Sequence, residues 1–168
     1  MLKVNVITTG GTIEKVYSEQ TSKVENLHSK IDRYLSQLRL PDCNVRVTRL
    51  MNKDSLEMTD ADRGAILELV EQLLIEPSPV IIVHGTDTMV QTGRYLKQAL
   101  PDLKVPIVLT GAMTPLGFEA SDGLQNLTES LFSVRILGPG IYVVMHNQVF
   151  PIDRVRKDLE TSRFVEIH

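Results

Sequence analysis

The sequence has little of three things: cysteine, long apolar runs and excess positive charge. Cys43 is the single cysteine, so no disulfide can form within the chain, and this favours a reducing compartment such as the cytoplasm. No apolar stretch approaches the about 18–20 residues of a membrane span, and residues 1–13 lack the apolar region of a signal peptide. The net charge is −3 with scattered lysines and arginines, whereas a nucleic-acid partner requires a basic stripe. We therefore expect a cytoplasmic protein with no nucleic-acid or membrane partner.

The remaining composition is that of a globular domain. Apolar residues make up 42% of the 168 residues and charged residues 23%, which is the ordinary balance of a folded chain with one core. The chain shows no internal repeat, no low-complexity stretch and no linker. We expect residues 1–168 to form a single domain.

Short β-branched runs alternate with segments of helical spacing. The runs lie at residues 4–8, 45–50, 80–83, 107–109 and 141–144, and most are continuous, as in strands buried on both faces. Apolar residues recur at helical spacing over 24–38, over 65–73 after a capped start at 59–62, after Thr88 and after Asp122. Such alternation predicts an α/β fold, a three-layer αβα sandwich around a mostly parallel, flavodoxin-like or Rossmann-like sheet.

Polar residues follow each predicted strand. Because parallel strands direct their carboxyl ends to one edge of a sheet, these residues are expected to converge there. They are Thr8 to Ile13, Asp54 and Ser55, His84 to Thr88, Thr110 to Met113, and His146 with Asn147, and Lys157 comes further on. The sequence therefore predicts a site for a small polar ligand at this edge.

The first strand ends in two glycines that admit more than one interpretation. Gly10 and Gly11 fit a plain tight turn, and they match neither the dinucleotide fingerprint nor a P-loop. They also allow backbone N–H groups to approach a ligand closely, as an oxyanion site requires. Thr12 places a hydroxyl beside such donors, although a threonine there also suits a helix cap.

The third strand ends in the most polar segment, HGTDT at residues 84–88. Thr86 or Asp87 suits a helix N-cap, and capping is compatible with catalysis. A threonine attacks when a base removes its proton, and a lysine is such a base when burial lowers its pKa from about 10.4 towards about 7–8. Lys157 lies in a charged segment that, taken alone, is typical of a solvated surface. The four histidines lack metal-ligand spacing, so we expect no metal site.

Three blocks of the sequence resemble the signature segments of the bacterial-type L-asparaginase family. They are TGGTI at 9–13, HGTDTM at 84–89 and LTGAM at 109–113. Four shorter segments are also similar to the family: DS at 54–55 with MT at 58–59, and SDG at 121–123 with NL at 126–127. The similarity runs from the first strand to about Phe164. It implies hydrolysis of the side-chain amide of L-asparagine to L-aspartate and ammonia without a cofactor, with some activity on L-glutamine.

The resemblance also implies roles for individual residues. Thr12 corresponds to the nucleophile, and Tyr17 corresponds to a tyrosine that assists it. Thr86 corresponds to the second hydroxyl, Asp87 to the carboxylate, and Lys157 to the amine that accepts the proton. The residues that correspond to the substrate-binding set are Gly11, Asp54, Ser55, Thr86, Asp87 and Ala112.

Departures from the family keep a second hypothesis open. Family enzymes continue into a smaller C-terminal domain that contributes an acidic residue to a neighbouring subunit's site, and this chain stops at His168. Leu56 also stands where many members carry a polar residue that holds the substrate. We expect a homodimer or homotetramer of a short asparaginase, in which the apolar residues of 148–168 pack on the domain and help form a two-fold interface. The alternative is an amino-acid-binding or regulatory module of the same fold with little turnover.

Overall fold

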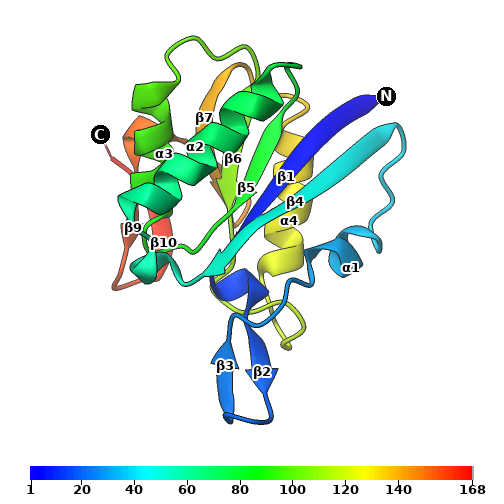
Figure 1. Ribbon diagram of the computed structural model, residues 1–168, viewed down its shortest axis with the longest axis vertical. Helices are drawn as coiled ribbons and strands as arrows, with labels where there is room; N and C mark the ends of the chain where they lie inside the picture. Colours follow the sequence, from blue (N-terminus) through cyan, green and yellow to red (C-terminus); the bar gives the residue numbers. More distant parts are fainter. Residues whose placement is uncertain (168) are drawn as a thin grey trace.

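A six-stranded sheet lies at the centre of the protein, and five of its strands are parallel. The computed structural model describes residues 1–167. The strands follow the order β4-β1-β5-β6-β7-β8, with β8 antiparallel to β7 (Figure 1). Their bounds are β1 (Leu2–Gly10), β4 (Cys43–Lys53), β5 (Val80–Val83), β6 (Pro106–Thr110), β7 (Gly140–Met145) and β8 (Gln148–Pro151). All five predicted strands are confirmed, and the parallel part has the flavodoxin-like order.

Helices cover both faces of the sheet and produce the predicted three layers (Figure 1). They are α1 (Ile31–Leu35), α2 (Asp60–Leu74), α3 (Met89–Ala99) and α4 (Gly123–Ser133). On one face Ile66 of α2 and Leu96 of α3 pack with Ile7 of β1. On the other face Leu127 of α4 packs with Val6, the neighbour of Ile7 in the same strand. Successive strand residues thus enter different cores, which is why the strands read as continuous apolar runs.

The longest helix, α2, begins where the sequence predicts it. Thr59 and Asp62 form a capping box: the Asp62 N–H donates to the Thr59 hydroxyl at 3.3 Å, and the Thr59 N–H donates to the Asp62 carboxylate at 2.8 Å. The Lys53 ammonium donates to the other Asp62 oxygen at 2.7 Å and, with the bonds from Thr59, lowers the pKa of Asp62 to about 2. Within residues 1–167, none of the helices combines the length and the apolar character needed to cross a membrane.

The predicted helix over residues 24–38 is largely wrong. Residues 16–25 instead form a two-stranded hairpin of β2 (Val16–Ser18) and β3 (Lys23–Glu25), and α1 retains only five residues. The hairpin projects from the body of the domain (Figure 1). Val24 in this hairpin and Leu27 just after it are exposed, because they have no core to face, whereas Ile31 and Leu35 pack against the sheet. The prediction of a helix over 24–38 therefore holds only in the second half of that segment, where α1 lies.

The segment after β7 packs on its own domain, as predicted. It forms β8, the short turn η3 (Ile152–Arg154), and a hairpin of β9 (Val155–Asp158) and β10 (Arg163–Glu166). Four apolar side chains of this segment join the core beneath α2 and α3; they are Phe150, Ile152, Val155 and Phe164. His168, the last residue of the predicted tail, lies outside the described residues. The β9–β10 hairpin is thereby held beside α3, and Lys157 lies on this hairpin.

Candidate functional site

Six of the nine predicted site residues lie at the carboxyl ends of β1, β4 and β5. β1 lies between β4 and β5, so the chain winds to one side of β1 first and to the other side afterwards. The adjacent ends of β1 and β5 therefore form the topological switch point, where doubly wound sheets bind ligands. Thr12 begins the short turn η1 (Thr12–Glu14) directly after β1, and Thr86 follows β5.

Close backbone contact joins these strand ends. A Cβ atom placed on Gly11 would lie 2.4 Å from the backbone N and Cα of Gly85, and one on Gly85 would lie 2.5 Å from the Oγ of Ser55. Gly11 also has a φ of 79°, which disfavours any other residue. The glycines thus let the segments that carry Thr12, Ser55 and Thr86 meet without intervening side chains.

Lys157 reaches this site from a distant part of the sequence. Its Nζ donates to the Thr86 Oγ1 at 2.8 Å and to the Asp87 Oδ1 at 2.6 Å. The Lys157 side chain is 14% exposed, whereas that of Arg156 beside it is 58% exposed. The alternation of the β9 strand turns Lys157 inward, and its partner in the β10 register is the buried Phe164. The solvated-surface interpretation is therefore wrong for Lys157.

Ser55 follows β4 and lies against Gly85. It is 1% exposed, and among the described residues its Oγ has no hydrogen-bond partner. Its carbonyl accepts a hydrogen bond from the Thr88 hydroxyl at 2.8 Å, which ties the β4 exit to the start of α3. A buried hydroxyl without a partner is costly unless a ligand or water satisfies it.

Asp54 is engaged with neighbouring protein groups. Its carboxylate accepts from Lys15 Nζ at 2.7 Å and from the Leu56 N–H at 3.1 Å. The hydrogen bond from Lys15 is the main cause that lowers the pKa of Asp54. Asp54 is therefore anionic at neutral pH, and it shapes the short turn η2 (Ser55–Glu57) that presents Ser55.

Tyr17 is not buried among the other predicted site residues. It lies in β2, paired across the hairpin with Val24, and its side chain is exposed. Ala112, in contrast, is 1% exposed and follows β6. A Cβ atom on Gly111 would lie 2.3 Å from the His84 carbonyl oxygen, so the Ala112 segment packs against the β5 exit.

Sequence reasoning assigned no individual role to three buried or partly buried polar groups around the site. His84 is fully buried; its Nδ1 lies 2.8 Å from the Gly85 carbonyl and its Nε2 lies 2.8 Å from the Thr92 hydroxyl. Burial lowers the pKa of His84 to about 4, so the ring is neutral at physiological pH. Glu14 accepts from the Gly10 N–H at 2.7 Å and is 1% exposed, and this burial raises its pKa.

The third such group is the pair of Asp122 and His146, whose side chains are 2.7 Å apart. Its sequence signals were the SDG segment at 121–123 and the place of His146 just after the last predicted strand. None of the His, Cys, Asp and Glu side chains in residues 1–167 gather in threes as a metal site requires.

The strand order and the site at its switch point define a doubly wound, flavodoxin-like α/β domain. The family model described as "Asparaginase, N-terminal" matches residues 3–165. The chain belongs to the asparaginase family, and it corresponds to that N-terminal domain.

Relatives of known name agree with this membership. The L-asparaginase of Thermococcus kodakarensis is 30% identical over 93% of this chain and 48% of that protein. L-asparaginase 1 of Escherichia coli K12 is 34% identical over 77% of this chain and 39% of that protein. The solved structure of the thermostable L-asparaginase from Thermococcus kodakarensis superimposes with a TM-score of 0.85 at 29% identity, covering 99% of this chain and 51% of that one. The chain thus spans about half the length of these relatives, or less.

Proposed function

We propose that this chain is a catalytic domain of an L-asparaginase, which hydrolyses the side-chain amide of L-asparagine to L-aspartate and ammonia. One observation carries the proposal: the Lys157 amine contacts Thr86 and Asp87, beside the glycine turn that holds Thr12. A hydroxyl, a carboxylate and a mostly buried amine in one group suit the activation of a threonine nucleophile. The names of the relatives support the same substrate.

In the proposed reaction, Thr12 is the nucleophile. Its Oγ forms a bond to the amide carbon, the C–N bond breaks, and ammonia leaves with the proton that the hydroxyl gives up. Lys157 accepts and returns that proton, and Asp87 and Thr86 hold its amine in place. Water then breaks the ester to Thr12, restores the hydroxyl and releases aspartate. These steps require no cofactor.

The remaining residues hold the substrate. The Ser55 hydroxyl, which has no protein partner among the described residues, binds the α-carboxylate. Asp87 faces the α-ammonium group, Asp54 orients the Ser55 turn, and the backbone of Gly11 and the Ala112 carbonyl surround the amide. Tyr17, on the β2–β3 hairpin, is the tyrosine that assists Thr12. L-Glutamine, which is one methylene longer, is a secondary substrate.

Two further features belong to the proposal. The protein acts as a homodimer or homotetramer, in which a second copy contributes to the site. It works in the cytoplasm, which agrees with the single, partly buried Cys43.

The test is ammonia release from L-asparagine by the purified chain. We expect turnover by the wild type, none by Thr12→Ala, and reduced turnover by Thr12→Ser, which keeps a hydroxyl. Thr12 lies in a partly exposed turn, so both variants should retain the wild-type melting temperature. Binding of asparagine in calorimetry without ammonia release contradicts the proposal and favours an amino-acid-binding module.

A further inference from the structure

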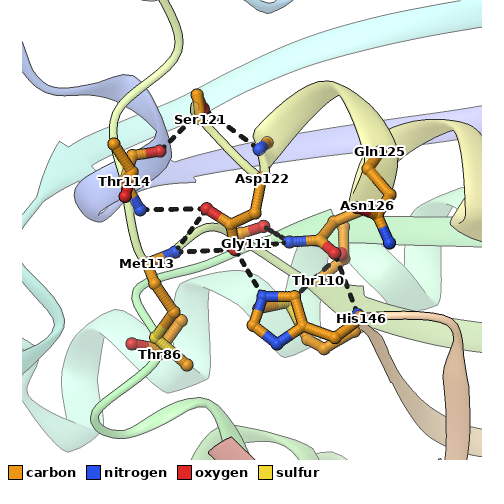
Figure 2. Close-up of polar contacts among 12 residues, drawn as sticks. Thr86, Thr110, Gly111, Met113, Thr114, Ser121, Asp122, Gln125, Asn126 and His146 are labelled. Atoms are coloured by element: carbon orange, nitrogen blue, oxygen red, sulfur yellow. Dashed lines mark hydrogen bonds and ion pairs between the residues drawn. The ribbon is translucent and has the colours of Figure 1, made fainter. Parts of the chain in front are cut away.

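Asp122 lies where two strand exits and a helix meet. Its carboxylate accepts hydrogen bonds from the backbone N–H of Met113 at 3.0 Å and of Thr114 at 2.9 Å, both in the loop after β6. It also accepts from Asn126 Nδ2 at 3.0 Å in α4 and from His146 Nε2 at 2.7 Å after β7 (Figure 2). The two backbone N–H groups and the Asn126 amide can only donate, so the site is built for an ionised carboxylate, to which His146 Nε2 then also donates.

Asn126 extends this cluster to the same two strand exits. The side chain is fully buried in α4. Its Nδ2 also donates to the Gly111 carbonyl at 2.9 Å, and its Oδ1 accepts from the His146 N–H at 3.0 Å (Figure 2). Asp122 and Asn126 are four residues apart, so they present their groups on one face of the helix start. The pair therefore holds residues on both sides of Ala112.

The ordinary explanation for an aspartate at this position is a helix N-cap, and the structure does not support it. Asp122 precedes α4 but has helical dihedral angles, and its side chain makes no capping hydrogen bond. The Ser121 hydroxyl instead accepts from the Gly123 N–H at 3.1 Å. The Asp122 carboxylate accepts from the backbone N–H groups of the β6 loop and from the Asn126 side chain, so it joins that loop to α4.

The Asp122 carboxylate is ionised at neutral pH. Burial acts to raise its pKa, but the N–H groups of Met113 and Thr114 and the side chains of His146 and Asn126 outweigh burial and lower it. An uncharged amide in its place cannot accept from all these donors, because its NH₂ group faces at least one of them.

We propose that Asp122 is a positioning residue, which together with Asn126 clamps the Gly111–Met113 backbone so that the Ala112 carbonyl meets the substrate amide. This inference rests on the proposed function. The clamped loop packs directly on the β5 exit, because Gly111 has no room for a side chain against the His84 carbonyl. A displacement of the loop therefore shifts the surroundings of Thr86 as well. Small misplacements at a reacting group cost up to about 10²-fold in rate.

Asp122→Asn is the test variant, and Glu129→Gln is its matched control. Glu129 is another acidic residue of α4, and it accepts from the Asn147 N–H after β7 at 2.7 Å, but it does not reach the β6 loop. We expect Asp122→Asn to lower kcat for L-asparagine about 10- to 100-fold. Its affinity for L-aspartate, which has no side-chain amide to meet the Ala112 carbonyl, should stay within about twofold of the wild type. Glu129→Gln should change neither quantity.

Amide hydrogen exchange makes the test independent of activity. The N–H groups of Met113 and Thr114 should be protected in the wild type and in Glu129→Gln, and they should exchange fast in Asp122→Asn. If Asp122→Asn does not fold, His146→Asn replaces it: His146 has a φ of 51°, which asparagine tolerates, and the change removes one donor to Asp122. His146→Asn should also make the N–H groups of Met113 and Thr114 exchange faster and leave the affinity for L-aspartate unchanged, with a smaller fall in kcat than Asp122→Asn.

Three results overturn the clamp: an unchanged kcat, an aspartate affinity that falls with kcat, or protection that persists at Met113 and Thr114. A wild type that releases no ammonia overturns the proposed function instead, and the exchange rates then still show whether Asp122 holds the loop.

Discussion

Lys157 shows how much a single residue depends on its surroundings. It holds Thr86 and Asp87 through hydrogen bonds of 2.8 and 2.6 Å while its neighbour Arg156 faces solvent. We expect Lys157→Met to lower kcat for L-asparagine by about 10²–10⁴-fold, because methionine fills similar space but cannot carry a proton. Arg156→Met, next to it in β9, should keep wild-type turnover. Near-normal activity of Lys157→Met in the ammonia assay assigns the base to another residue.

His84 makes the stability of the protein sensitive to acid. Its pKa is about 4 in the folded protein, against 6.5 when unperturbed, because burial favours the neutral ring. The unfolded chain therefore binds a proton that the folded protein does not, and stability falls as the pH drops from about 6.5 towards about 4. We expect this residue to cost about 2 kcal/mol of unfolding free energy between about pH 7 and pH 5.

Urea titrations of the wild type and of His84→Gln at the two pH values isolate this contribution. Glu14 acts in the opposite sense, because burial raises its pKa and the folded protein then gains stability on acidification. It is present in both proteins, so its effect cancels in the comparison. Equal pH dependence of the two proteins contradicts the role of His84.

At the scale of elements, the β9–β10 hairpin delivers the proposed base, and Phe164 anchors this hairpin. Phe164 is 3% exposed and pairs across the hairpin with Lys157. We expect Phe164→Ala to lower the free energy of unfolding by about 3–5 kcal/mol, because it leaves a cavity in the core.

Val165→Ala is the control for this prediction. Val165 follows Phe164 in β10, so its side chain points to the opposite face of the hairpin, where it is only partly buried. The variant should lose far less stability in urea denaturation. Equal losses in the two variants mean that the hairpin is not anchored through Phe164.

At the scale of the whole molecule, the segment after β7 offers apolar groups that its own domain does not cover. Leu159 is 76% exposed in the turn of the β9–β10 hairpin, two residues after Lys157, and Val149 is also exposed. We expect these groups to form a two-fold interface in which a second copy contributes to the site. Light scattering at micromolar concentration should give a dimer or tetramer for the wild type and a smaller species for Leu159→Glu.

Ile75 provides the matched control for assembly. It is 81% exposed, but it follows the end of α2 beside the beginning of β1, at the opposite end of the sheet from the site. Ile75→Glu should leave the wild-type mass unchanged. A monomeric wild type with full asparaginase activity contradicts the shared site.

Features that depend on neighbouring residues could be predicted from the amino-acid order. Val80 to Val83 read as a buried strand because both faces of that strand are covered, and Thr59 with Asp62 marked the start of α2 because a capping box involves only four residues. The polar residues after each strand indicated the edge at which the candidate site lies, and the resemblance of Thr12, Thr86 and Asp87 to the asparaginase blocks indicated the chemistry that we propose for it.

Features that depend on contacts across the fold could not be predicted in this way. Helical spacing over 24–38 did not reveal that Val24 faces solvent in a hairpin, because periodicity does not show whether a core lies opposite. Lys157 lies 70 residues from Asp87, and Asp122 lies 24 from His146, so their contacts follow from strand order and helix placement. Local rules of periodicity and capping describe the elements, whereas a site is assembled from their ends by packing between segments that are distant in the chain.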